Sequence, residues 1–279
     1  MSAIRLGYLR AILQTLDDDA EGAAAALYSA MRAGRYFDGD LGQLMYSYRA
    51  VSAVRPALER TRPSPSSLAL LAQAIAEADR DDILRAQFLS LRVELLQGRP
   101  ADPGLIGPRA RPVLLVNRPL RSHQVVRQLE VFDRLLQAAS GPWPARIDAI
   151  GATDARALAG FPFGPGKVDR ERLEAVVFRS VRPLAVNRAI RIAVAVERYR
   201  RDHDERLPND LQALVPTYLP AVPVDPFTGT DMRFAKDAGG YIAYSVGSNR
   251  RDDGGDVTVG WRDGDRSAPD PGIRIRYAK

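Results

Sequence analysis

Apolar residues along the first part of the chain recur every three or four positions, in runs separated by short polar or Gly- and Pro-containing breaks. This spacing predicts amphipathic helices, because one face of an α-helix returns every 3.6 residues. The expected helices cover residues 3–16, 20–33, 41–60, 66–78, 79–98 and 120–138. Short helices with short links are typical of an all-α domain, and no signature recurs at the fixed period that a helical solenoid requires.

In the rest of the chain, the pattern of residues changes from a Gly- and Pro-rich segment to a helical period and then to short β-prone runs. Residues 141–167 are rich in Gly and Pro and predict a connector. Residues 168–203 return to helical periodicity, with Pro183 either starting a new helix or kinking one. Pro, Gly and Asp then separate four β-prone runs, at 232–234, 241–246, 257–261 and 273–277.

The prediction is therefore an α+β protein with three parts. Residues 1–140 form an N-terminal all-α helical domain, and 141–167 form the connector. Residues 168–279 form a head, in which a long helix packs on a small antiparallel β-sheet. Within that sheet, the run 241–246 leads into an acidic loop and is the expected central strand.

Composition excludes several classes of function. The 279 residues carry a net charge of +6, but acidic residues alternate with arginines along most of the chain. A nucleic-acid-binding protein usually gathers its positive charge on one face, so no nucleic-acid partner is expected. No apolar run reaches the length of a membrane span, so none is expected in this chain. Cysteine is absent, which excludes disulfides, thiolate metal sites and a Cys nucleophile.

Motifs for catalysis are missing. The two histidines, His123 and His203, lie in different predicted elements, so a three-histidine metal centre cannot form. The segment 164–167 reads Gly-Pro-Gly-Lys, but Phe161 and Val168 occupy the positions where a phosphate-binding loop has Gly and Ser or Thr. The carboxylates alternate with arginines, which indicates solvated helix faces. We predict no catalytic residues and no enzymatic activity.

The most specific part of the sequence is residues 193–257, where short motifs follow one another in a fixed order. In chain order they are the helix end Glu197–His203, then Leu207-Pro208, Leu211–Leu214, Leu219-Pro220, Asp225–Gly229, Tyr244–Gly247, and Asp252–Val257. This order resembles the soluble head of the major pseudopilin of type II secretion systems. The resemblance covers roughly residues 184–260.

The resemblance implies a calcium site in the loop after Tyr244, because major pseudopilins hold Ca²⁺ there with carbonyl and carboxylate oxygens. The corresponding positions are the carbonyl of Val246 and the side chains of Asn249, Asp252, Asp253 and Asp256. A solvated Asp-Gly turn joining two strands explains the same residues, and Arg250-Arg251 adds positive charge beside them.

The resemblance also implies a non-catalytic bacterial envelope protein that acts in assembly or in recognition of protein partners such as secretion-system or envelope components. Its expected location is the periplasm or cell envelope, with an upstream anchor, although the cytoplasm is an alternative. Nothing before Leu184 looks like the processing site and apolar helix with which pseudopilins form filaments, so filament assembly is not expected. Two other functions stay open: a helical-repeat-type adaptor, and an enzyme with a cleft at the domain junction.

Overall fold

A computed structural model describes residues 3–34, 40–79, 81–97, 118–154, 156, 170–257 and 270–277. The α-helices within these ranges are α1 (Ala3–Leu16), α2 (Ala20–Gly34), α3 (Asp40–Arg60), α4 (Pro65–Ala78), α5 (Ile83–Gln97), α7 (Arg118–Ala138), α8 (Ala145–Ala152) and α9 (Arg170–Asp202). All of them except α8 lie in segments that were predicted to be helical. Pro183 lies inside α9, so the long helix is one element.

Among the residues that the structure describes, three strands follow α9, and they form one antiparallel sheet of order β1-β2-β3. Their bounds are β1 (Arg233–Asp237), β2 (Gly240–Tyr244) and β3 (Gly272–Arg276). β2 pairs with both neighbours, as the sequence predicted for the central strand. The α+β prediction is confirmed. The run 257–261, predicted as a further strand, lies outside the described residues apart from Val257, which is in no strand.

The chain divides into two compact units, and the division differs from the predicted one. Unit 1 comprises residues 1–80 and 181–279, and unit 2 comprises residues 81–180. The first four helices therefore belong with the head instead of with α5 and α7. The predicted connector 141–167 contains helix α8, and its residues 155 and 157–167 lie outside the described part.

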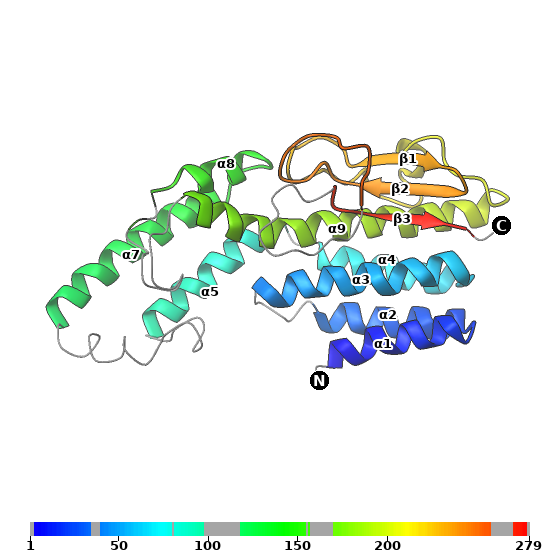
Figure 1. The fold of residues 1–279 in the computed structure, drawn as a ribbon, viewed down its shortest axis with the longest axis horizontal. Coiled ribbons are helices and arrows are strands. Elements are labelled where there is room, and N and C mark those ends of the chain that lie inside the picture. The colour runs from blue at the N-terminus through cyan, green and yellow to red at the C-terminus, as the bar shows by residue number, and fades with distance from the viewer. Residues whose placement is uncertain are drawn as a thin grey trace. The chain divides into compact units, whose positions relative to one another are not determined.

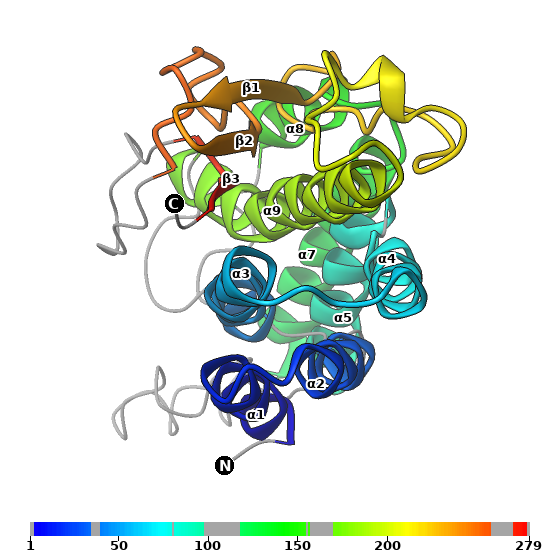
Figure 2. The same cartoon turned by 90° about the vertical axis from the view of Figure 1, so that its right-hand side faces the viewer.

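A shared hydrophobic core is the physical reason why unit 1 joins the two ends of the chain. One cluster of buried side chains runs from α1–α4 through α9 to the sheet, and includes Leu27, Leu71, Ala193 and Ile275. The layers follow one another as the sheet, α9, the pair α3 and α4, and the pair α1 and α2 (Figure 2). Since burial of apolar surface is the main stabilising term in folding, these layers are expected to fold together.

Polar contacts cross the same layers. Asp79, at the C-terminal end of α4, accepts from Arg188 of α9 at 3.0 Å and from Arg191 at 3.2 Å. Asn187 of α9 donates to the carbonyl of Ile75 at 3.0 Å. These partners lie more than 100 positions apart in the sequence, so local patterns could not have indicated that they meet.

Unit 2 contains α5, α7, α8 and the first turns of α9, and α7 packs on both α5 and α8 (Figure 1). Phe88 of α5 and Phe132 of α7 are completely buried in it. The guanidinium of Arg146 lies 4.0 Å from the ring centre of Trp143, and the indole N–H of Trp143 donates to Asp81 at 2.8 Å. Unit 2 thus has side-chain contacts of its own that fix its loops.

Candidate functional site

The predicted calcium ligands lie in the loop that follows β2, and hydrogen bonds within this loop already engage three of them. Asn249 donates from Nδ2 to Asp253 Oδ2 at 2.8 Å. Asp252 Oδ1 accepts from the hydroxyl of Tyr244 and from the backbone N–H of Gly254, each at 3.0 Å. Burial and the neighbouring Asp252 raise the pKa of Tyr244 to about 12, so this hydroxyl stays a donor at neutral pH.

The start of the same loop is fixed by a residue that the calcium prediction did not include. Asp225 is buried, and its carboxylate accepts three hydrogen bonds from the chain around it. Oδ1 accepts from the backbone N–H of Phe227 and from the hydroxyl of Ser245, each at 2.9 Å, and Oδ2 accepts from the backbone N–H of Val246 at 2.9 Å. Asp225 therefore ties the Asp-Pro turn to the end of β2.

Asp270, just before β3, is the second residue that the sequence prediction missed. Its side chain is 2% exposed, and Oδ2 accepts from the backbone N–H of Gly255 at 2.9 Å, while Oδ1 is buried with no hydrogen-bond partner. Burial, together with the negative charges of Asp253 and Asp252, raises the pKa of Asp270 to about 6. No signal in the sequence connects Asp270 to the loop, because the strand pairing of β2 with β3 brings them together.

Glycines let the loop turn tightly beside the sheet. Gly254 and Gly255 have φ angles of +75° and +72°, which favour glycine. A Cβ added to Gly255 would lie 2.6 Å from Cδ1 of Ile242, which is too close. The backbone of the loop thus packs directly on the face of β2.

In this arrangement, the predicted calcium ligands and Asp270 do not form a cation site. Across the described residues, no group of three or more His, Cys, Asp and Glu side chains converges as a metal ion requires. Ca²⁺ needs about six to eight oxygen ligands, so the hydrogen bond between Asn249 and Asp253 would have to open before their oxygens could turn to one ion. Among the described residues, the unpartnered oxygen of Asp270 is a feature that favours a cation here.

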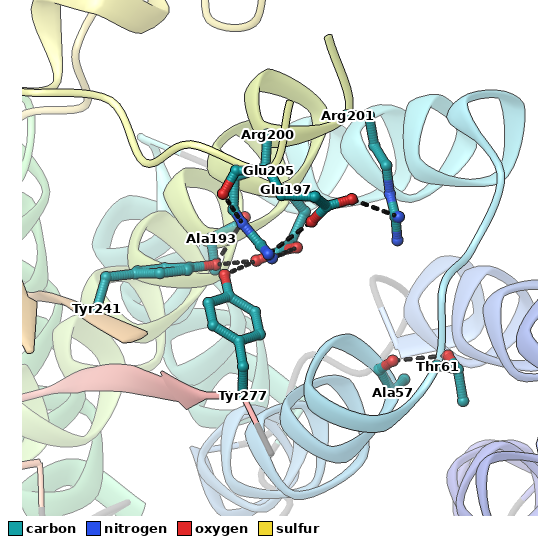
Figure 3. A network of polar contacts seen from close by, with 9 residues as sticks. All are labelled: Ala57, Thr61, Ala193, Glu197, Arg200, Arg201, Glu205, Tyr241 and Tyr277. Atoms are coloured by element: carbon teal, nitrogen blue, oxygen red, sulfur yellow. Dashed lines mark hydrogen bonds and ion pairs between the residues drawn. The ribbon is translucent and has the colours of Figure 1, made fainter. Parts of the chain in front are cut away.

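A network of polar contacts in unit 1 lies between α9 and the sheet, and Glu197 is at its centre (Figure 3). The Glu197 side chain is 3% exposed. Its Oε1 accepts from the hydroxyls of Tyr241 at 3.0 Å and Tyr277 at 2.6 Å, and its Oε2 accepts from Arg200 at 2.8 Å. Burial raises the pKa of Glu197, while the hydrogen bond from Tyr277 and the charge of Arg200 act in the opposite direction.

The partners of Glu197 are themselves held in place. The hydroxyl of Tyr241 also contacts the carbonyl of Ala193 at 3.1 Å. The guanidinium of Arg200 lies 3.7 Å from the ring centre of Tyr277 and donates to Glu205 at 2.6 Å. Both oxygens of the buried carboxylate are satisfied, so the network acts as a clamp that fixes the sheet on α9.

The end of α9 carries a group of aromatic rings, of which Tyr199 and Tyr218 are partly buried and His203 is exposed. The rings of Tyr199 and His203 stack with their centres 3.8 Å apart, and the ring of Tyr218 meets Tyr199 edge-on. Nδ1 of His203 lies 2.8 Å from the carbonyl of Tyr199, and the hydroxyl of Tyr218 donates to Asp202 at 2.7 Å. These contacts attach the 207–219 segment to the helix.

Comparisons with known proteins give no further guide to this site. No family model, no curated protein and no solved structure matches the chain. Of the helices in the described residues, none is long and apolar enough to cross a membrane.

Proposed function

We propose that the chain is a non-catalytic bacterial envelope protein, related to type II secretion pseudopilins, that acts in assembly or partner recognition. The observation that supports this most is the α9–sheet unit, in which the Glu197 clamp holds a three-stranded antiparallel sheet on one long helix. Both oxygens of the buried Glu197 carboxylate accept hydrogen bonds from residues that hold the sheet on the helix. Such a rigid unit suits the presentation of a fixed surface to a protein partner.

One edge of the sheet is available for recognition. β1 is an edge strand, and its Arg233, Ala235 and Lys236 are exposed. The other edge strand, β3, packs against α3, and Glu59 of α3 accepts from the backbone N–H of Arg276 at 3.0 Å. A partner that adds a strand or docks on the sheet therefore meets β1, because an unpaired edge offers backbone donors and acceptors.

Photo-cross-linking in living bacteria tests this function. A photoreactive amino acid replaces Ala235 on β1, and the matched control replaces the exposed Ala25 on α2. We expect specific cross-links from position 235 to components of a secretion system or the cell envelope, and none of these from position 25. Cross-links only to cytoplasmic proteins would refute the envelope function and favour the adaptor.

We propose secondly that the loop after β2 binds Ca²⁺ through the carbonyl of Val246 and the side chains of Asn249, Asp252, Asp253 and Asp256. The supporting observation is the buried, unpartnered oxygen of Asp270, whose pKa is raised beside this loop. A divalent cation would offset the negative charge that burial makes unfavourable there. Isothermal titration of the chain with CaCl₂ tests this proposal. Heat of binding is expected, and its absence would mean that the loop is only a solvated Asp-Gly turn joining two strands.

A further inference from the structure

Four leucines on α1 form a stripe that the described residues of unit 1 leave exposed. Leu6, Leu9, Leu13 and Leu16 are 52%, 45%, 60% and 62% exposed. Their spacing of three, four and three residues is the a and d pattern of a helix that packs against another helix. Large apolar side chains scattered singly on a surface are ordinary, but four in one continuous row mark an interaction surface.

The orientation of α1 is fixed by its opposite face. Tyr8 and Ala11 are buried on that face, where α1 packs on α2 and α3. A Cβ added to Gly7 would lie 2.9 Å from the Cβ of Ala30, which shows how closely the backbones of α1 and α2 approach. α1 lies in the layer farthest from the sheet (Figure 2). The leucine stripe therefore cannot turn inward without breaking this packing.

Charge along the stripe is divided between its two ends. Arg5 is exposed in the first turn of α1 and Arg10 near its middle, and Asp17 and Asp18 are exposed directly after its last turn. Two such helices side by side in the same direction would place like charges together. In opposite directions, the basic end of each lies beside the acidic end of the other.

We propose that the leucine stripe is an interface between two copies of this chain, formed by antiparallel pairing of α1 about a two-fold axis. The arrangement sets Leu6 against the partner subunit's Leu16 and Leu9 against the partner subunit's Leu13. Each copy thus offers the same surface, as a two-fold interface requires. The acidic end argues against a lipid surface as the occupant, because helices that lie on membranes carry basic residues along their polar face.

The surface is small for a protein–protein interface. A helix of 14 residues is about 21 Å long, so the pair buries an area at the low end of specific interfaces. Because weak and transient complexes have interfaces of this size, the dimer is expected to dissociate on dilution. This inference stands on α1 alone and does not depend on the function proposed for the head.

Sedimentation equilibrium over a range of protein concentrations measures the dimer. Leu13→Glu would bury a carboxylate in the pairing and is expected to raise the dimer Kd about tenfold or more. The matched control is Leu70→Glu on α4, where the leucine is 48% exposed but lies outside the stripe; its Kd is expected to equal that of the native chain. Equal circular dichroism melting curves establish that both variants fold.

Charge exchange tests the direction of pairing independently. Asp17→Arg is expected to weaken the dimer, and Arg5→Glu added to it is expected to restore the native Kd. Because the chain has no cysteine, single-cysteine variants give a second readout. A mixture of the Leu6→Cys and Leu16→Cys chains is expected to form a disulfide-linked dimer. Neither variant is expected to form such a dimer by itself. A native chain that stays monomeric at all concentrations, or a dimer unaffected by Leu13→Glu, would overturn the proposal.

Discussion

Removal of the arginine that neutralises Glu197 is expected to destabilise unit 1 strongly. Arg200→Met keeps most of the aliphatic side chain but leaves the Glu197 carboxylate, 3% exposed, without its cation. Breaking a buried ion pair in this way costs about 3–5 kcal/mol of unfolding free energy. The neighbouring Arg201 is the matched control, because it pairs with the more exposed Glu205 at 3.1 Å. Arg201→Met is expected to cost about 0–1 kcal/mol.

The pH dependence of this loss has a definite sign. Burial already raises the pKa of Glu197 in the folded protein, and loss of the Arg200 charge raises it further. A carboxyl with a raised folded pKa destabilises the fold as pH rises through that pKa, and has no such effect below its unfolded value of 4.5. The cost of Arg200→Met is therefore expected to be larger at pH 7.5 than at pH 4.

Urea denaturation at these two pH values measures the effect, and a double-mutant cycle identifies its source. Glu197→Gln in the Arg200→Met background removes the unpaired charge, so the double variant is expected to lose less than the sum of the two single losses. Equal costs for Arg200→Met and Arg201→Met, or an Arg200→Met cost that does not change with pH, would refute the role given to the Glu197 clamp.

Other contacts around the acidic loop give three more expected outcomes. Burial and the neighbouring carboxylates raise the pKa of Asp270 to about 6 in the folded chain, above its ordinary value of 3.8, so its ionisation destabilises the fold as pH rises. Asp270→Asn is therefore expected to gain stability over the native chain as pH rises from 4 to 7 in urea melts, and parallel pH profiles would contradict this. Asp225→Ala leaves three buried donors without an acceptor and is expected to lower the unfolding free energy by at least about 3 kcal/mol, whereas Asp231→Ala, at an exposed position, is the near-neutral control. Calcium at millimolar concentration is expected to raise Tm relative to chelator, and Asp253→Ala to abolish the gain; identical Tm values would exclude the calcium site.

Helix periodicity determined most of the secondary structure from sequence alone. The expected helix at 3–16 has the bounds of α1, and the expected central strand 241–246 contains most of β2. Such elements are set by neighbours three or four positions apart, or two in a strand, which the sequence displays directly. The start of one helix differed: the expected helix 66–78 begins at Pro65 in α4, and Ser64 accepts the capping hydrogen bond from the backbone N–H of Ser67.

Domain organisation could not be obtained in the same way. The Gly- and Pro-rich segment 141–167 suggested a boundary between a helical half and a head. The structure instead places α1–α4 in the same unit as the sheet, because their apolar faces and the Asp79–Arg188 pair meet across more than 100 positions. Composition shows where a chain is irregular, but it does not show which surfaces complement each other.

The residues of the candidate site also fall into two groups, those that the sequence indicated and those that only the folded structure brings together. The acidic loop residues stand close together in the sequence, so a motif revealed them. Asp270 and the partnership of Glu197 with Tyr241 and Tyr277 appear only in the folded chain, because strand pairing and the packing of α9 bring distant residues within hydrogen-bond distance. The sequence determined which elements form, and the tertiary structure decided which polar groups are buried together, since burial depends on contacts between surfaces far apart along the chain.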